Sequence, residues 1–385
     1  MAQSRLSFDA NADTPVHPLV LEAWVDAEQN YPGNPASLHR EGRRAQGVLE
    51  DARSRVARLL QCSAKEIIFT SGATEGNNLA LLGMADALSE QLGRPLSIWT
   101  SLAEHPSVLG PLRMLQQKGH LLTLLPVGKG GEISNEGWEK AATEGAPDLI
   151  ALQWANNETG VVQPLHLLRH FPSTPFHCDA VQGFGKLPLH TDVLRAETLV
   201  LSGHKLYAPK GVGLLRVSEM ALIHTILGGG GQQNGVRPGT ESPALATALA
   251  LALELAMEEQ RTFAKRANQC RRVFLDALHK KTSRFQENHT PKGLPNTLNL
   301  TFSGLDGRML LPACDAQGLG LSAGSACSSG APDPSPVLQA AGLSREDSRS
   351  SVRISFDRNT TKEEAHEGGA RLGETVLRLY EIALR

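Results

Sequence analysis

Apolar and polar positions follow two different periods along the first 220 residues of the chain. Between 37 and 60, and again from Thr74 onward, apolar residues recur at the spacing of a helix. Between such stretches lie short apolar runs typical of buried strands, at 66–70, 97–101, 121–125, 148–154, 175–179, 198–201 and 212–217. Strands that alternate with helices in this way predict an α/β fold with a mostly parallel sheet covered by helices on both faces.

A long helix is predicted to begin at Ser242 and Pro243. This pair combines a capping residue with proline in the first turn, and the apolar pattern continues to about Leu278. A chain of 385 residues is too long for one small core, so we expect this helix to bridge into a second lobe.

The second lobe is predicted to mix strands and helices. Strands are expected at 297–302 and 352–356, and the last helix opens on the capping box Thr361-x-x-Glu364. Between these elements, 322–335 is dominated by Gly, Ser, Ala and Pro, a composition typical of a mobile loop.

Composition excludes several classes of function. A net charge of −2 and 4% aromatic residues give no electrostatic or base-stacking case for binding nucleic acid, nor a charge that favours a membrane surface. The start of the chain lacks the apolar segment of a secretory signal, and the most apolar segment, 244–257, is too short to cross a bilayer. We therefore expect a cytoplasmic enzyme that does not contact a membrane.

The five cysteines do not form a recognisable framework. They lie at positions 62, 178, 270, 314 and 327, and no two of them form a Cys-x-x-Cys pair. An odd number at wide spacing argues against both a disulfide framework and a structural zinc site, so no metal is expected.

Lys205 is the most informative candidate for chemistry. The motif Ser202-Gly203-His204-Lys205 follows an apolar run and delivers a lysine onto a loop with small and polar neighbours. A lysine in such a place suits imine formation with an aldehyde cofactor, which requires the neutral amine and hence a pKa below the ordinary value of about 10.4. Asp179 ends another apolar run, where a pyridinium partner is expected, although a structural carboxylate would fit there too.

The turn at 71–75, with the sequence Ser-Gly-Ala-Thr-Glu, links a predicted strand to a predicted helix. Backbone N–H groups at such a helix start, together with the Thr74 hydroxyl, form an anion cradle, although an ordinary capped turn has the same residue types. In a chain that also contains Lys205 and Asp179, the phosphate interpretation is favoured. The implied cofactor is pyridoxal 5′-phosphate, with its aldehyde at Lys205, its ring nitrogen at Asp179 and its phosphate at Ala73 and Thr74.

Further polar residues follow the predicted strands. His105 lies where a strand ends and a helix begins, and the loop 156–160, Asn-Asn-Glu-Thr-Gly, follows another strand. Carboxyl ends of strands are where α/β folds bind ligands, so both segments fall on the expected edge. A lone histidine is more often structural, and Gln182 is also compatible with an ordinary polar loop.

Two residues of the second lobe have uncertain roles from sequence alone. Cys327 lies in Ser-Ala-Cys-Ser-Ser-Gly within the loop predicted to be mobile, whereas buried cysteines usually lie in apolar runs. It is either incidental or a nucleophile that travels with the loop. Arg353, between Val352 and Ile354, could bind a substrate carboxylate bidentately or form a salt bridge between the lobes.

In this order, the motifs resemble those of the cysteine desulfurases, pyridoxal-phosphate enzymes of the class V aminotransferase group with fold type I. The resemblance extends from Phe8 to the last helix, and its most specific segments are 33–37, 70–75, 156–160, 202–205, 237–240 and 325–327. It implies a large cofactor-binding domain, 16–258, with a mostly parallel seven-stranded sheet. A smaller α+β domain, formed by 1–15 and 259–385, would carry the mobile loop with Cys327. The long loop around Cys327 resembles that of the housekeeping and nitrogen-fixation branch.

The resemblance also implies the roles of the residues around the cofactor. Lys205 would form the imine and remove the Cα proton of the substrate, and His105 would stack on the pyridine ring. Asp179 would pair with the ring nitrogen, and Gln182 would contact the ring hydroxyl. Asn157 would help to hold both substrate and cofactor.

The phosphate, the substrate and the sulfur are assigned in the same way. Thr240 would reach the phosphate from the neighbouring subunit, which implies an obligatory homodimer. Arg353 would bind the carboxylate of L-cysteine, and Cys327 would accept the sulfur as a persulfide, leaving L-alanine. The persulfide would pass to an acceptor such as an iron–sulfur scaffold protein. The other phosphate ligands implied are Ala73, Thr74, Ser202 and His204.

The chain departs from the family pattern near its start, where Ala-Asp-Thr-Pro at 12–15 replaces the usual Ala-Thr-Thr-Pro. The Asp13 carboxylate could alter affinity or pH dependence at the substrate end of the pocket, or it could point outward. The chain stops at Arg385, directly after the last predicted helix, so a docking tail for a scaffold protein is expected to be short or missing.

Other functions remain open at this point. Selenocysteine lyase activity would use the same residues, and a non-catalytic cofactor-binding scaffold or regulator is a rival of another class. A dinucleotide oxidoreductase is disfavoured, because the glycines at 228–231 lack the strand–G-x-G-x-x-G–helix layout.

Overall fold

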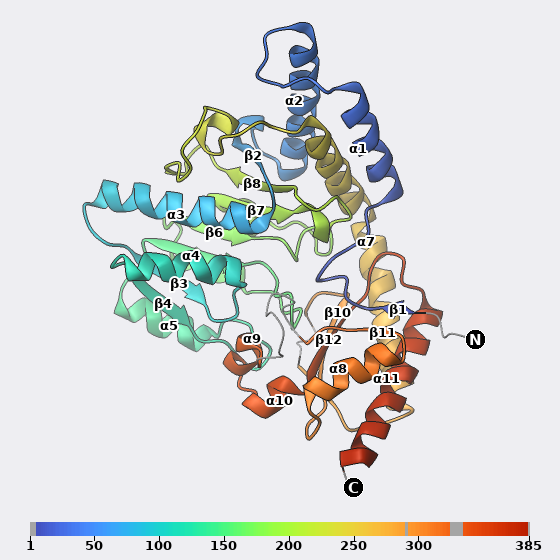
Figure 1. Cartoon of the computed structure of the whole chain (residues 1–385). Helices are drawn as coiled ribbons and strands as arrows, with labels where there is room; N and C mark the ends of the chain where they lie inside the picture. Colours follow the sequence, from blue (N-terminus) through green and yellow to red (C-terminus); the bar gives the residue numbers. More distant parts are fainter. Residues whose placement is uncertain (1–4, 289–291, 324–333, 384–385) are drawn as a thin grey trace.

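The computed structural model describes residues 5–288, 292–323 and 334–383, and they form two lobes joined by one long helix (Figure 1). The larger lobe contains a seven-stranded sheet in the order β2-β8-β7-β6-β5-β3-β4. All neighbouring strands are parallel except for β8, which is antiparallel to both β2 and β7. The prediction of a mostly parallel sheet is therefore confirmed. The strands are β2 (Ile67–Thr70), β3 (Ser97–Ser101), β4 (Leu121–Leu125), β5 (Leu149–Gln153), β6 (Phe176–Asp179), β7 (Thr198–Ser202) and β8 (Gly213–Val217).

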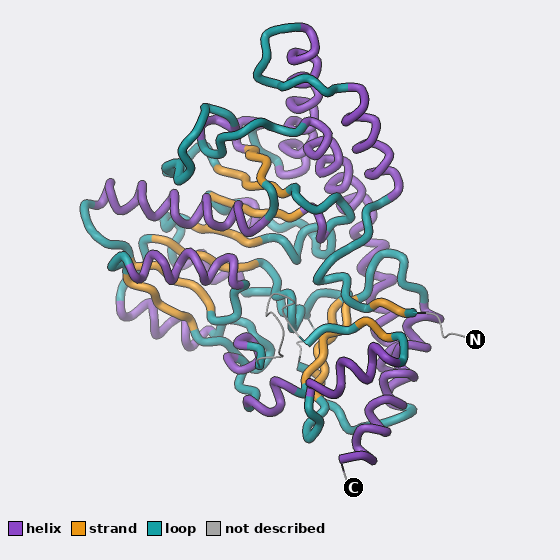
Figure 2. The backbone as a smooth tube through the Cα atoms, viewed as in Figure 1, coloured by secondary structure: helices purple, strands orange, loops and turns teal. Residues whose placement is uncertain are grey.

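Helices cover both faces of this sheet, as predicted (Figure 2). Because side chains alternate along a strand, Leu199 and Leu201 pack on one face while Val200 packs on the other. The first face is covered by α2 (Arg40–Leu60), α5 (Asn135–Glu144) and α7 (Pro243–His279). The second is covered by α3 (Ala73–Leu92) and α4 (Pro106–Gln117).

The long helix α7 connects the lobes. Its cap is the predicted one, because the Ser242 side chain accepts a hydrogen bond from the backbone N–H of Leu245. One part of α7 packs against α1 (Pro18–Asn30) and α2, and another packs against α11 (Lys362–Ala383) in the smaller lobe. The capping box before α11 is formed as predicted, with reciprocal hydrogen bonds between Thr361 and Glu364.

The smaller lobe has its own core around a three-stranded antiparallel sheet. Strand β10 (Thr297–Thr301) lies between β12 (Ser351–Ser355) and β9 (Gln286–Glu287). Phe8, Phe274 and Phe356 form an edge-to-face cluster in this core. The start of the chain reaches this lobe through β1 (Leu6–Ser7), which pairs with β11 (Leu319–Gly320). The remaining short helices are α6 (Thr191–Leu194), α8 (Gly307–Ala316), α9 (Pro336–Ala340) and α10 (Arg345–Arg349).

Two features bear on the function classes considered from sequence. No helix in the described part of the chain is long and apolar enough to cross a membrane. The carboxyl ends of β5, β6 and β7 point toward the second lobe, and the N-terminal segment runs past these ends before it enters α1 (Figure 1).

Candidate active site

A cavity of about 410 Å³ lies at the carboxyl ends of the central strands. Its size is typical of a small-molecule site, and strand ends of this kind are where open α/β sheets bind ligands. The structure brings together in its wall most of the residues predicted from the sequence. These are Ala73, Thr74, His105, Asn157, Asp179, Gln182, Ser202, His204 and Lys205.

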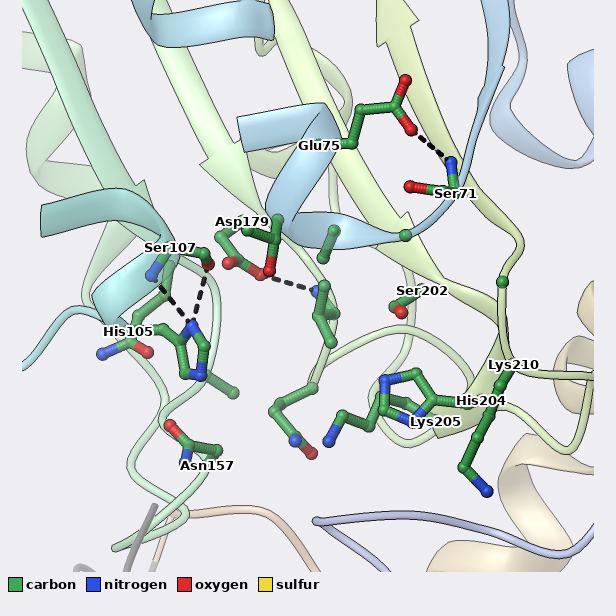
Figure 3. A pocket seen from close by; sticks show the side chains of 18 residues that line it. Ser71, Glu75, His105, Ser107, Asn157, Asp179, Ser202, His204, Lys205 and Lys210 are labelled. Carbon is green, nitrogen blue, oxygen red and sulfur yellow. Dashed lines mark hydrogen bonds between the residues drawn. The ribbon is translucent and has the colours of Figure 1, made fainter. Parts of the chain in front are cut away.

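Lys205 lies in the 3-10 turn Gly203–Lys205 directly after β7, where the sequence predicts a loop. The turn is tight, because a Cβ at Gly203 would lie 3.0 Å from the Cβ of Ala208. The Lys205 Nζ donates hydrogen bonds to the carbonyls of Asn11 at 2.8 Å and Ala12 at 2.6 Å. The N-terminal segment therefore holds the amine at the edge of the pocket, beside His204 (Figure 3).

Asp179 ends β6 and faces the pocket with its carboxylate held in place. One carboxylate oxygen accepts a hydrogen bond from the Asn77 side chain at 2.9 Å, and the other accepts from the Val181 backbone at 3.1 Å. Asn77 in turn bonds the ring of His177 at 3.0 Å. Burial lowers the pKa of His177 to about 3, so this ring is neutral and adds no positive charge behind Asp179.

His105 is the N-cap of α4, followed by Pro106 at the first helical position. Its Nδ1 accepts a hydrogen bond from the Ser107 backbone N–H at 3.1 Å, so the ring proton of the neutral form is on Nε2. Burial lowers the pKa of His105, against the opposing effect of Asp179, and the charge of Lys205 lowers it further. A neutral ring with its polar edge engaged is suited to packing against a planar ligand.

The turn before α3 has the properties of an anion cradle. Gly72 caps the helix without a side-chain hydrogen bond, which leaves the first backbone N–H groups available at the wall of the pocket. The conformation of Gly72, with φ of 154°, favours glycine, and its close approach to Gly213 requires glycine at position 213, where a Cβ would lie 2.6 Å from the Cα of Gly72. The carboxylate of Glu75 is bound by the Ser71 N–H at 2.6 Å and by Arg237 at 2.7 Å. The residues present therefore fit a phosphate ester.

Asp13, the departure from the family pattern, does not point away from the site. One carboxylate oxygen lies 3.1 Å from Nδ1 of His204, and the other pairs with Lys210. Burial raises the pKa of Asp13, but hydrogen bonds from Lys210 and His204 outweigh burial and leave the pKa below its ordinary value. Asp13 thus places a negative charge beside a residue expected to bind phosphate.

Arg353 is not in the wall of the cavity. It lies on β12 with a side chain only 1% exposed, and its Nη2 forms an ion pair with Asp9 at 2.6 Å. Its Nη1 donates to the carbonyl of Asn157 at 3.1 Å, which places the guanidinium directly behind the pocket. Because Asp9 and Arg353 belong to the same lobe, this ion pair is not the salt bridge between the lobes that the sequence left open, and binding of a substrate carboxylate stays a prediction.

Two further predicted residues are separate from the pocket of this chain. Thr240 is exposed and lines a different cavity, which it shares with Arg237 and Ser71. Its contribution to a neighbouring subunit stays a prediction. Cys327 lies outside the described residues, as do most of the residues of the predicted mobile loop.

Three buried polar residues that the sequence pattern does not reveal support the site. Asn77 holds Asp179, Asn11 accepts the hydrogen bond of Lys205 through its carbonyl, and Lys186 bonds Gln182 at 2.6 Å. Each is a single polar residue with no motif around it. The only sequence signal at Asn77 is an amide on the apolar face of a predicted helix.

Comparisons with known proteins agree with this geometry. The family described as Aminotransferase class-V matches residues 6–367. A protein of Rickettsia africae (strain ESF-5) named Cysteine desulfurase IscS is 37% identical over 367 residues, which cover 93% of this chain and 87% of the relative. The solved structure of a NifS-like protein matches with a TM-score of 0.87 at 31% identity and covers 97% of this chain and all (100%) of that one. That of SspA in complex with cysteine matches with a TM-score of 0.77 at 32% identity, covering 91% and 98%.

Proposed function

The chain belongs to the class V aminotransferase family, and from this premise we propose that it is a cysteine desulfurase. In this proposal the enzyme uses pyridoxal 5′-phosphate to remove the sulfur of L-cysteine, which gives L-alanine and a persulfide on Cys327. The name of the Rickettsia africae relative and the cysteine bound to SspA support this substrate.

One observation carries the proposal. A single cavity of about 410 Å³ is lined by Lys205, by the oriented carboxylate of Asp179 and by the N-terminus of α3. Lys205 would hold the aldehyde, Asp179 the ring nitrogen, and the α3 turn with Ser202 and His204 the phosphate. When bound there, the cofactor supplies an electron sink for the carbanion at the substrate Cα.

The residues of the chain provide the proton transfer and the orientation. Lys205, once neutral, accepts the Cα proton, and its two carbonyl partners at 2.8 and 2.6 Å fix the place from which it acts. Asp179, fixed by Asn77, would keep the ring nitrogen protonated. His105 would cover one face of the ring, Gln182 would bond the ring hydroxyl, and Asn157 would lie at the substrate end.

Cys327 accepts the sulfur in this proposal, and the other cysteines are poor candidates. Burial raises the pKa of Cys62 to about 11 and that of Cys314 to about 12, and it raises the pKa values of Cys178 and Cys270 as well. A thiol with a raised pKa has little of the nucleophilic thiolate at neutral pH. The assignment to Cys327, which lies outside the described residues, rests on its Ser-Ala-Cys motif.

The substrate carboxylate is assigned to Arg353. The guanidinium already bonds the carbonyl of Asn157, whose side chain is in the pocket wall, and its planar fork matches a carboxylate. Binding of L-cysteine then requires the ion pair between Arg353 and Asp9 to break, so that the guanidinium can bind the carboxylate of the substrate.

The proposal includes a partner and a compartment. The protein acts as a homodimer in which Thr240 completes the phosphate site of the other subunit. The persulfide passes to a sulfur-accepting protein such as an iron–sulfur scaffold. A thiol that must stay reduced to accept sulfur suits the cytoplasm.

The test is to load the purified protein with pyridoxal 5′-phosphate, add L-cysteine, and measure alanine together with protein-bound sulfur. We expect alanine and bound sulfur in equal amounts in the first turnover. Cys327→Ser should keep the visible absorbance of the bound cofactor but lose the bound sulfur. Cys62→Ser, the matched control, should keep both, and a loaded protein that forms no alanine would refute the proposal.

A further inference from the structure

Lys186 is a buried cation next to the proposed active site, and neither the family motifs nor the proposed mechanism uses it. It lies in the turn after β6, is 7% exposed, and its backbone carbonyl accepts a hydrogen bond from Gln260 at 3.2 Å. Burial of an ammonium group without a carboxylate is costly, so its retention calls for a reason.

The hydrogen bonds of Lys186 lead directly to Lys205. The Lys186 Nζ donates to the side-chain oxygen of Gln182 at 2.6 Å and to that of Asn11 at 3.2 Å. The amide nitrogen of Gln182 donates to the Asn11 carbonyl at 3.0 Å, and Lys205 donates to the same carbonyl at 2.8 Å. Lys186 and Lys205 therefore both donate hydrogen bonds to Asn11, one to its side chain and the other to its backbone carbonyl.

This arrangement fixes the orientation of the Gln182 amide. An ammonium group can only donate hydrogen bonds. The amide of Gln182 must therefore turn its oxygen, and not its N–H₂ group, toward Lys186. The N–H₂ group must then face the side on which Lys205 lies. Gln182 consequently offers a donor to an anionic oxygen bound in the pocket.

The charges around Lys186 are mostly positive. Burial, followed by the charges of Lys205 and Arg353, lowers the pKa of Lys186 to about 7. A small cavity of about 20 Å³ between the two lysines is also lined by Tyr207, Glu259 and Arg358, and Glu259 lies 3.3 Å from Arg358. Burial raises the pKa of Tyr207, so this phenol is neutral. Within the described residues, no carboxylate forms an ion pair with Lys186.

We propose that Lys186 is a positioning residue for Lys205, which orients the Gln182 amide and whose amine, bound to the same asparagine as the amine of Lys205, is coupled to it by charge repulsion. This inference rests on the proposed function, because it assumes that Lys205 captures the cofactor. The physical reason is mutual repulsion, since two amines held this close repel each other when both are protonated, and removal of one makes the other easier to protonate.

The test measures how fast the cofactor-free protein captures pyridoxal 5′-phosphate as a function of pH, followed by visible absorbance. The midpoint of this profile reports the ionisation of Lys205. Lys186→Met keeps the length of the side chain and removes the charge, so the midpoint should rise by about one pH unit. Gln182→Glu gives Lys186 a carboxylate partner and should also raise the midpoint, which keeps the inference testable if Lys186→Met folds poorly.

Lys281→Met is the matched control, because Lys281 is partly exposed and pairs with Glu374 at 2.8 Å, away from the pocket. Its midpoint should equal that of the unaltered protein. A midpoint that is unchanged or lower in the folded Lys186 or Gln182 variant would overturn the role of Lys186 and leave the proposed function intact. A failure of the unaltered protein to capture the cofactor would overturn both.

Discussion

The two ends of the pocket are built in different ways. At the cofactor end, the side chains come from adjoining strands of one sheet, and the strand register places Asp179 opposite Gln153 and Ser202 opposite Gly213. At the substrate end, the contacts join the two lobes, as where Arg353 of the smaller lobe donates to the carbonyl of Asn157, 196 residues earlier in the chain. The first end depends on one sheet, and the second depends on the packing of two lobes.

This difference has a consequence for function. Strand ends in a regular sheet give fixed positions, which suits a cofactor that stays bound. A junction between two lobes can adjust without disturbing the sheet, which suits a substrate that must enter and leave. Changes at the cofactor end should therefore abolish function, and changes at the substrate end should alter affinity.

The largest effect is expected at the cofactor end, from Lys205→Ala. This variant loses the group proposed both to hold the cofactor and to act as the base, so the turnover number should fall by about 10³-fold or more. The measurement is alanine formation together with the visible absorbance of the cofactor-loaded protein. Lys210→Met removes another lysine of the pocket wall and should keep the absorbance, and a Lys205→Ala protein with normal turnover would contradict the comparison.

Arg353→Lys should act at the substrate end. Loss of the planar fork should raise the KM for L-cysteine by about 10- to 100-fold, with a smaller change in the turnover number. The absorbance of the cofactor should not change, which separates the two ends of the pocket. If the KM were unaltered in the folded variant, Arg353 would serve only as the partner of Asp9.

The pH dependence of the free energy of unfolding tests the protonation of Glu104, a buried residue behind the cofactor end. Burial raises the pKa of Glu104 well above its ordinary value, so in the folded protein this carboxyl holds its proton to higher pH than in the unfolded chain. Stability is then lost as pH rises from the ordinary pKa toward the folded one. Glu104→Gln should increase the free energy of unfolding at pH 8 by about 1 kcal/mol or more and have no effect near pH 4. Urea unfolding at both pH values checks this, and an equal gain at both would contradict the assignment.

The smallest effect is expected from Asp13→Thr. Asp13 pairs with His204 and Lys210, so its carboxylate opposes the binding of a phosphate there. The variant should bind pyridoxal 5′-phosphate about two- to fivefold more tightly, because a partly exposed charge is screened by water. Weaker binding in a titration would show that Asp13 orients His204 rather than competing with phosphate.

The same comparison explains what could be predicted from the sequence. Short runs with apolar centres mark the strands, so β3 and β4 were predicted with their observed bounds, although Leu121 and Leu124 of β4 are exposed at the edge of the sheet. Lys205 and Asp179 followed from the ends of such runs. Helix α1 was not predicted, because Leu19 and Leu21 are exposed and interrupt its apolar pattern.

The supporting residues Asn11 and Lys186 could not be predicted from the sequence for a different reason. The side chains of Asn11 and Thr297 form a hydrogen bond although they are 286 positions apart in the sequence, and those of Lys186 and Asn11 do so at a separation of 175 positions. Neither contact leaves a local pattern in the sequence. Sequence spacing also could not show that Arg353 pairs with Asp9. Contacts of this kind depend on how segments far apart in the chain pack together, and they are where the structure adds most to the site.

The most direct test of the central proposal is a single turnover with L-cysteine followed by mass spectrometry of the digested protein under non-reducing conditions. One additional sulfur atom should appear on the peptide that contains Cys327, with one equivalent of alanine in solution, and none should appear on the peptides with Cys62, Cys178, Cys270 or Cys314. Alanine formed with no sulfur on Cys327, or sulfur on one of the other cysteines in its place, would contradict the assignment.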